Sequence, residues 1–375
     1  MRYKFDNIAF NITEKRDPVP EDRLTYVGLE HMDSGSLYIN RYGLDVELKG
    51  SKLVMHKGDI LLGKRNAYLR RAAIAPHDGL FSAHGMVLRP KENVIDKNFF
   101  PFFVASDKFF DEVIRISVGG LSPTVNWKDL KELVFNLPPL AEQKVLAEKL
   151  WAAYRLKESY KKLLAATEEM VKSQFIEMFG DPVTNPKNWE KIPINDLCLK
   201  ITDGTHKTPI YQDDGIVFLS AKNIKNGNFD YKDVKYISYE EYLFLDKRCT
   251  PRKNDIVITK SGSIGDCAIL DADFPVAFFE SLALLKIKDR ISPLFFKYVF
   301  KNKYLHNEIM SRCIKGLAIK HLHLEELKKI EIIVPPLEQQ IQFTTIVRQA
   351  DKSGFELRKS IDAIDKVIKS LINEN

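Results

Sequence analysis

The sequence predicts an α+β protein made of two tandem domains and two long antiparallel helices that form a coiled coil. Three observations predict this fold. The stretch "NLPPLAEQK" at 136–144 returns as "IVPPLEQQI" at 333–341, so the prolines Pro138 and Pro335 lie 197 residues apart. Each stretch leads into a long helical pattern, and each follows short strand-like runs separated by Gly, Asn, Asp and Pro turns.

The repeat extends well upstream of the prolines. "KGDILLGK" at 57–64 matches "KNDIVITK" at 253–260, and "GGLSPTVNWKDLKELVFNLPPL" at 119–140 matches "KGLAIKHLHLEELKKIEIIVPPL" at 315–337. One insertion accounts for the change of offset from 196 to 197. The period is far too long for a solenoid unit, so we expect a duplicated domain with a pseudo-two-fold relation.

Short elements follow the same order in both copies. Strands are predicted at 24–29, 59–63, 215–220, 255–259 and 283–287, and short helices at 97–106 and 292–302. A glycine turn and an alternating strand then lead to each proline pair, which starts a helix. The predicted domains are 1–138 and 181–335, and the predicted spacer helices are 139–180 and 336–375.

The two helical stretches are predicted to pair with each other. The first, Leu140 to Phe179, contains no proline or glycine, and Gly180-Asp181-Pro182 ends it. Each helix is about 55–60 Å long at about 1.5 Å per residue, too long for a small domain to cover its apolar stripe. The order domain, helix, domain, helix makes the pair antiparallel, with a head at each end. The expected stripe residues of the two helices recur at spacings of mostly three and four: Leu146, Leu150, Ala153, Leu156, Tyr160, Leu163, Met170 and Val171, then Phe343, Ile346, Ala350, Leu357, Ile361, Ile364, Ile368 and Leu371.

Composition restricts the class of protein. The chain has 375 residues, enough for two or three domains, and no window approaches the ~18 uncharged apolar residues of a membrane span. Its charged N-terminus lacks the apolar core of a signal peptide. The four cysteines lie far apart without a C-x-x-C pair, which predicts a reducing cytoplasm and neither a disulfide framework nor a structural zinc site.

The loops of both heads carry side chains suited to DNA. Two homologous heads on a spacer suit a reader of two half-sites, which lie about 34 Å apart when they face one side of B-DNA. The net charge of +6 fits a polyanion only if the basic residues gather on one face. Arginine and lysine pair with phosphate or guanine, and asparagine pairs with adenine. The predicted DNA-binding residues are Lys64, Arg65, Asn66, Tyr68, Arg70, Arg71, Ser122, Thr124 and Asn126 in the first head, and Lys207, Thr208, Lys222, Asn223, Lys225, Lys260, Ser261, Ser263, Lys315, Lys320 and His321 in the second.

A solvated surface explains any one of these residues equally well, and their recurrence in both copies is what supports the group. The first copy places four cations in "KRNAYLRR" (64–71), whereas the second has "KSGSIGDC" (260–267), with small hydroxyls and glycines. The two heads are therefore expected to prefer different bases, which makes the target bipartite and asymmetric.

Catalytic motifs are not found in the sequence. The proline pairs lack the amide before them and the ring after them that adenine methyltransferases use, since Leu137 and Val334 precede them and leucine follows. No G-x-G loop follows a strand, and no Walker A motif is present. His321 and His323 have no further ligands nearby, so no metal site is predicted. Spacing alone leaves a scattered Asp/Glu/Lys nuclease site open.

The assembled motifs resemble the specificity subunits of type I restriction-modification systems. The resemblance covers essentially the whole chain. It rests on "GLSPTVNWKDL…NLPPLAEQ", "GLAIKHLHLEEL…VPPLEQQ", "WEKIPINDLCLKITDGTHKTP" (189–209) and "KSGSIGDCAI" (260–269). The first head departs from it, because "GKRNAYLRRAAI" replaces the "GSIG"-like turn.

The resemblance implies a non-catalytic subunit with two target recognition domains joined by conserved spacer helices. Its implied partners are double-stranded DNA, two modification subunits that carry S-adenosylmethionine and methylate adenine, and restriction subunits. No cofactor is expected on this chain itself. Two alternatives belong to other classes: a stand-alone DNA methyltransferase or nuclease, and a bivalent scaffold that binds only proteins.

Overall fold

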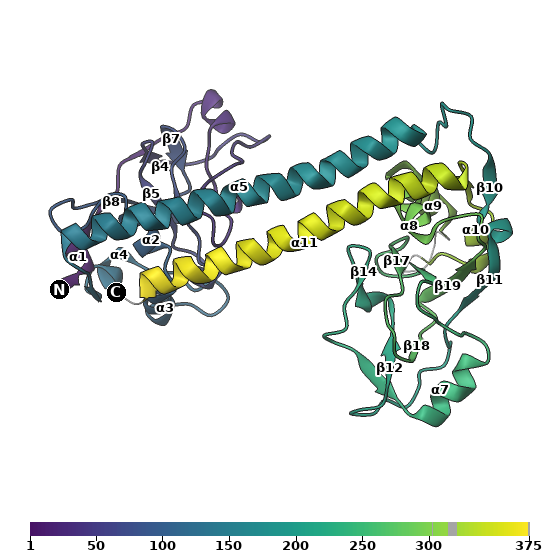
Figure 1. Ribbon diagram of the computed structural model, residues 1–375. Coiled ribbons are helices and arrows are strands. Elements are labelled where there is room, and N and C mark those ends of the chain that lie inside the picture. The colour runs from purple at the N-terminus through teal and green to yellow at the C-terminus, as the bar shows by residue number, and fades with distance from the viewer. Residues whose placement is uncertain (302, 314–320, 374–375) are drawn as a thin grey trace. The chain divides into compact units, whose positions relative to one another are not determined.

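A computed structural model describes residues 1–301, 303–313 and 321–373 of the chain (Figure 1). The chain forms two units: Met1–Leu164 with Glu356–Asn375, and Ala165–Phe355. The two long helices are α5 (Leu140–Phe179) and α11 (Leu337–Asn373), and each unit contains a portion of both. The predicted α+β class is confirmed, and α5 has the bounds that the absence of proline and glycine predicted.

The first unit contains two antiparallel sheets and a separate strand pair. Its larger sheet has the order β2-β8-β5-β6 and its smaller sheet the order β3-β4-β7, while β1 pairs with β9. The strands are β1 (Arg2–Lys4), β2 (Ala9–Ile12), β3 (Lys15–Arg16), β4 (Lys52–Met55), β5 (Ile60–Gly63), β6 (Ala72–Ile74), β7 (Gly79–Phe81), β8 (Gly85–Pro90) and β9 (Val134–Asn136). Every residue of the central strand β5 is buried, which is why its sequence is apolar throughout instead of alternating.

The second unit repeats the larger sheet and the strand pair. The order β11-β19-β16-β17 corresponds to β2-β8-β5-β6, and β10-β20 corresponds to β1-β9. The smaller sheet, β15-β12-β18, differs because β12 and β18 are parallel, whereas β4 and β7 are antiparallel. The strands are β10 (Lys191–Pro193), β11 (Cys198–Asp203), β12 (Ile216–Leu219), β13 (Ile224–Lys225), β14 (Asn228–Phe229), β15 (Lys235–Ile237), β16 (Ile256–Thr259), β17 (Cys267–Ile269), β18 (Val276–Phe278), β19 (Leu282–Ile287) and β20 (Glu331–Ile333). The internal repeat thus conserves the frame of the head and varies its smaller sheet.

Short helices occupy matching places in the two heads. The first head has α1 (Phe5–Ile8), α2 (Phe100–Val104), α3 (Asp107–Arg115) and α4 (Trp127–Leu130). The second has α6 (Ile194–Leu197), α7 (Tyr239–Asp246), α8 (Pro293–Phe300), α9 (Lys303–Arg312) and α10 (Leu324–Lys328). Helices α2 and α8 lie within the predicted ranges 97–106 and 292–302.

The predicted strand at 24–29 is wrong. Two 3-10 helices, η1 (Pro20–Leu24) and η2 (Leu29–His31), flank this stretch, and of its residues Val27 alone forms a β-bridge, to Phe81. Tyr26 and Val27 lie in a loop, and their side chains are buried. Their apolar pattern therefore resembles that of a strand, although the backbone is not paired as in a sheet.

The repeated aspartate of "KGDI" and "KNDI" closes the turn before the central strand. Asp59 accepts a hydrogen bond from the His56 amide at 2.8 Å, and Asp255 accepts one from the Arg252 amide at 2.8 Å. Gly58 and Asn254 precede them with φ of 94° and 75°, a left-handed conformation that glycine and asparagine tolerate. The motif therefore recurs because both copies need the same turn.

A buried glutamine explains the repeated "PPL" stretch. The Gln143 side chain donates to the carbonyls of Pro138 (2.9 Å) and Val94 (3.1 Å) and accepts from the Asp96 amide (2.8 Å). Gln340 makes the matching bonds to Pro335 (2.8 Å), Arg290 (3.2 Å) and the Ser292 amide (2.9 Å). All donor and acceptor groups of each amide side chain are engaged, so each glutamine joins the start of a long helix to its head.

Within each unit, portions of the two long helices pack together and against the head. In the first unit, Leu150 and Tyr154 of α5 belong to the head's buried core, with Ile368 of α11 packed against it, and Lys157 pairs with Asp365. In the second unit, rings of α5 and α11 pack against each other: Phe179 lies 5.6 Å from Phe343, measured between ring centroids. The order of these contacts confirms the antiparallel pairing.

The predicted pairing of the two helices is confirmed, and both helices also contribute to the head cores. Three predicted stripe residues are exposed: Leu156 (46%), Leu163 (53%) and Met170 (45%).

Candidate nucleic-acid interface

The loop that follows β5 has a tightly fixed backbone. Asn66 (φ 55°) and Arg70 (φ 47°) adopt the left-handed conformation on either side of the 3-10 helix η3 (Ala67–Leu69). Non-glycine residues seldom adopt this conformation, so the surrounding contacts must hold it in place. Tyr68 lies within this turn and is 54% exposed.

A second loop of the first head, 118–125, lies against this one. The Val125 amide donates to the Lys64 carbonyl at 3.0 Å, and the Asn66 amide donates to the Pro123 carbonyl at 2.8 Å. The Arg65 guanidinium lies 3.4 Å from the Ser122 hydroxyl, and Arg65 forms a β-bridge with Thr124. The structure thus brings together Lys64, Arg65, Asn66, Ser122 and Thr124. Asn126 is exposed and directly precedes α4.

Two polar side-chain groups at this junction have no partner among the residues that the structure describes. Lys64 is half-buried, and no carboxylate lies within ion-pair distance of it in the described ranges. Burial, reinforced by the positive charge of Lys15, lowers the pKa of the Lys64 amine below its ordinary value. The Asn66 Oδ1 atom is buried and accepts no hydrogen bond from any described residue. Such groups are uncommon in folded proteins and indicate a place where a ligand or water completes the site.

Arg70 and Arg71 are placed differently. The Arg70 guanidinium pairs with Asp107 and Asp111 of α3, at 2.6 Å each, and Lys369 of α11 pairs with Asp107 at 3.1 Å. Arg70 therefore fastens the loop to a helix of its own head. Arg71 is half-buried, and its carbonyl accepts a hydrogen bond from the Gly63 amide at 2.9 Å.

In the second head, Lys260 takes the place of Lys64 but is 2% exposed and pairs with Asp203. Asp203 also pairs with Arg248, and His206 lies 3.4 Å from it. Burial by itself raises the pKa of the Asp203 carboxyl, but its hydrogen bond to Lys260 and the surrounding positive charges hold that pKa below its ordinary value. The ammonium of Lys260 is thus neutralised by a carboxylate that stays ionised.

The turn after Lys260 contains two glycines with positive φ, Gly262 (72°) and Gly265 (85°). Ser263 is exposed on it, and Ser261 is half-buried. The Leu322 amide donates to the Lys260 carbonyl at 2.8 Å, which brings His321 to the same place. Burial, with the positive charge of Lys260, lowers the pKa of His321. Lys315 and Lys320 lie outside the described residues.

The other predicted residues of the second head differ in exposure. Lys207 and Thr208 are exposed. Lys222 pairs with Asp233 at 3.2 Å, and Lys225 pairs with Asp230 at 2.7 Å. Asn223 is 2% exposed, and its side chain bonds to backbone groups of its own loop, among them the Ser220 amide at 3.0 Å and the Asp233 carbonyl at 2.9 Å. The side chains of Asn223 and Lys260 therefore face protein and not solvent. Contact of the predicted set with DNA stays a prediction.

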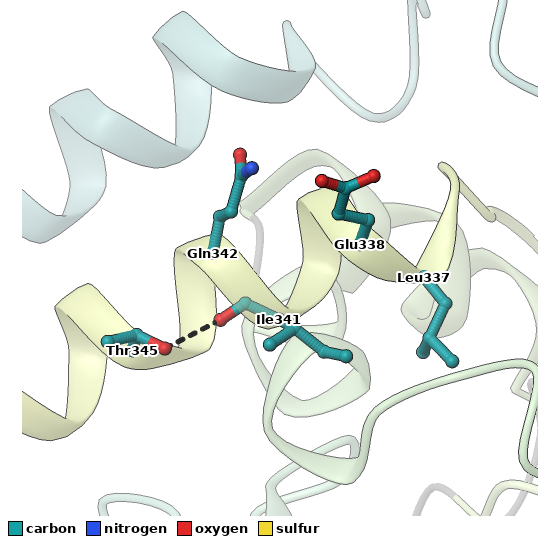
Figure 2. A pocket seen from close by; sticks show the side chains of 5 residues that line it. All are labelled: Leu337, Glu338, Ile341, Gln342 and Thr345. Atoms are coloured by element: carbon teal, nitrogen blue, oxygen red, sulfur yellow. Dashed lines mark hydrogen bonds between the residues drawn. The ribbon is translucent and has the colours of Figure 1, made fainter.

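A groove of about 550 Å³ lies on the first turns of α11 (Figure 2). Figure 2 shows Leu337, Ile341 and Thr345 along one side of the helix, with Thr345 Oγ1 donating to the Ile341 carbonyl at 2.9 Å. Leu337 and Ile341 are 43% and 53% exposed. Exposed apolar side chains gathered on one helix face are typical of a protein-protein contact.

The start of α5 carries a groove of similar size, about 540 Å³. Its lining includes Lys144 and Glu148, which the repeat offset of 197 aligns with Ile341 and Thr345. The two equivalent helix starts therefore present different chemistry, charged in the first unit and apolar in the second.

Residues 1–301, 303–313 and 321–373 contain no group of three His, Cys, Asp or Glu side chains that could hold a metal ion. Over the same ranges, no helix is both long and apolar enough to span a bilayer.

Sequence reasoning missed the residues that hold the site in place. Asp203 lies within the quoted stretch "WEKIPINDLCLKITDGTHKTP" (189–209), but its partners Lys260 and Arg248 are far away in sequence, so no local pattern reveals the cluster. The two glutamines did carry a signal, since Gln143 and Gln340 stand at the repeat offset of 197. An amide retained at the same place in both copies could have been read as a buried link.

The chain matches a family model described as the type I restriction modification DNA specificity domain, over residues 28–168 and 186–364. It is 23% identical over 279 residues to the type I restriction enzyme EcoBI specificity subunit of Escherichia coli, covering 65% of this chain and 58% of that subunit's length. It is 22% identical over 348 residues to the MjaVIII specificity subunit of Methanocaldococcus jannaschii, covering 88% of this chain and 80% of that one. The crystal structure of a type I restriction-modification S subunit from M. genitalium shares the fold, with a TM-score of 0.61, 14% identity and coverage of 99% and 94%.

Proposed function

The chain belongs to the type I restriction modification DNA specificity family, and we propose that each of its heads binds one half of a bipartite, asymmetric DNA target. One observation carries this proposal. In both heads, the loop after the central strand pairs with the loop before the last short helix, through Lys64 and Val125 in one head and Lys260 and Leu322 in the other. The frame is the same while the side chains differ, as two readers of different sequences require.

The chain is the non-catalytic specificity component of a type I restriction-modification complex. The proposed partners are two modification subunits that methylate adenine and carry S-adenosylmethionine, and restriction subunits that complete the nuclease. The grooves at the starts of α5 and α11 are the proposed docking places of the modification subunits. The proposed location of the chain is the cytoplasm, where it would meet DNA.

Methylome sequencing of cells with and without this gene tests the proposal. The expected result is one bipartite motif, methylated on adenine, that disappears when the gene is deleted. Methyl transfer to DNA by the purified chain alone, given labelled S-adenosylmethionine, would instead support a stand-alone methyltransferase. Weak duplex binding that does not respond to salt would support a scaffold that binds only proteins, because phosphate contacts impose a steep salt dependence.

Arg65 and Arg70 are expected to respond differently to substitution by glutamine. Arg65 is exposed beside Ser122, so Arg65→Gln should weaken duplex binding about ten-fold and leave stability unchanged. Arg70→Gln breaks the pairs with Asp107 and Asp111 and should lower the free energy of unfolding by about 1 kcal/mol, since these pairs are partly exposed. Fluorescence anisotropy with labelled duplex and thermal unfolding measure the two effects. Equal effects of both variants on both measurements would contradict these roles.

The groove on α11 is expected to bind a modification subunit through apolar contact. Ile341→Asp places a charge among exposed apolar side chains and should weaken that subunit's binding about ten-fold or more, with little effect on folding. Isothermal titration with the purified modification subunit measures the change. Lys352→Glu, at an exposed position further along the same helix, is the control. Unchanged binding by Ile341→Asp would place the docking surface elsewhere.

A further inference from the structure

We infer that Lys64 and Lys260, which hold equivalent places in the two heads, have different functions. Lys64 binds a phosphate of the DNA backbone, whereas Lys260 positions its loop and contacts no phosphate. The inference rests on the proposed function, because it assumes that both heads approach a duplex.

The two lysines are equivalent in the backbone. Each is the first residue after the central strand of the larger sheet, because β5 ends at Gly63 and β16 ends at Thr259. Each also accepts, through its carbonyl, a hydrogen bond from the loop before the last short helix of the head, from Val125 or Leu322. Their side chains therefore start from the same point of the same frame.

The positive charge of Lys260 is neutralised inside the protein and is not available to DNA. Its ammonium is buried against the Asp203 carboxylate, which Arg248 and His206 also approach. A buried ion pair is strongly disrupted when one partner is removed, because the remaining charge stays desolvated. The pair consequently holds Lys260 in place, and with it the carbonyl that binds Leu322.

Among the described residues, Lys64 has no such counter-charge. Strand β11 extends to Asp203, opposite Ala283, whereas its counterpart β2 ends at Ile12, opposite Val87. The next residue of the chain, which the register would place opposite Met86, is Thr13, and it carries no charge. The described part of the chain supplies no carboxylate to Lys64 from any other element, and its charged neighbour Lys15 is also a cation.

The surroundings of Lys64 favour an anion. A half-buried ammonium without a partner is unfavourable, and a phosphate oxygen would remove this cost. Arg65 and the Ser122 hydroxyl lie at the same junction of loops and offer further donors to phosphate. In the second head, the equivalent place holds the Lys260–Asp203 ion pair and the glycines Gly262 and Gly265.

Salt titrations of duplex binding by the full chain test this division. The probe is a labelled duplex of mixed sequence, and the readout is the slope of log K against log salt concentration. Lys64→Gln should reduce the magnitude of this slope by about 0.9 and weaken binding about ten-fold near 0.1 M salt. Lys64→Arg, which keeps the charge, should restore both values. The double variant Asp203→Asn with Lys260→Gln removes both charges of the buried pair and should not reduce the slope.

Lys57→Gln is the matched control, because Lys57 is an exposed lysine before the other end of β5. Thermal unfolding of each variant verifies that the chain is folded. An unchanged slope for Lys64→Gln, or an equal loss of slope in the Asp203/Lys260 double variant, would overturn the inference and leave the proposed function standing. Absence of duplex binding by the unaltered chain, both alone and with its modification subunits, would overturn both.

Discussion

Gln340→Met is expected to lower the free energy of unfolding of the second unit by about 2–4 kcal/mol. Methionine has nearly the length of glutamine but cannot replace its hydrogen bonds. The substitution leaves the Ser292 amide and the carbonyls of Arg290 and Pro335 without their partner in a buried place. Each buried polar group left unsatisfied costs about 1–3 kcal/mol, partly recovered where water enters. Gln143→Met should have the same effect on the first unit, because its three bonds are equivalent.

Gln342→Met serves as the control, since Gln342 lies exposed on the same helix (Figure 2) and should change stability by less than about 0.5 kcal/mol. Urea unfolding gives the magnitude, and hydrogen exchange shows where protection is lost. The loss should be confined to the junction of the helix with its own head, around 290–296 and 335–343 for Gln340→Met. A destabilisation no greater than that of Gln342→Met would show that the glutamine is not needed to join the helix to its head.

The long helices and the repeat could be predicted from the sequence because their signals are local or identical in both copies. An uninterrupted run without proline or glycine from Leu140 to Phe179 gave the bounds of α5 directly. The pairing of β1 with β9 was not predictable in this way, since it joins Tyr3 to Phe135 and depends on the closed fold. The strand expected at 24–29 is wrong because a local signal was misleading. Tyr26 and Val27 are buried, as strand residues often are, but they belong to a loop that crosses the core.

The candidate site shows the same division. Residue type and recurrence identified the loops that meet in each head, but not which side chains remain available. Lys260 and Asn223 belong to types that often bind DNA, yet their charge or amide is used inside the protein, by Asp203 and by the loop backbone. The Lys260 pair joins residues that are far apart in the sequence, and the Asn223 side chain points into the protein. Neither fact can be predicted from residue type. Lys64 has no carboxylate partner in the described part of the chain, whereas its counterpart Lys260 pairs with Asp203, and the sequence of the two loops does not predict this difference.

Insertion of one heptad into both long helices is expected to lengthen the preferred DNA spacer between the half-sites. The insertions belong after Leu164 and after Phe355, where the two units divide, so that the packing of each head on its helices is untouched. Seven residues preserve the phase of the apolar stripe and add about 10 Å of helix, the axial length of about three base pairs. Three base pairs are therefore the upper limit of the change, and twisting of the DNA reduces it because each added base pair also rotates the second half-site.

Methylome sequencing of a strain that carries the doubly inserted gene measures the new spacer directly. A heptad placed in α5 alone is the control. It shifts the antiparallel helices out of register and should abolish methylation of the bipartite motif without producing a new spacer. If the doubly inserted protein instead methylates the original motif, the helices do not set the distance between the half-sites. The heads would then select the spacer through their own contacts with DNA.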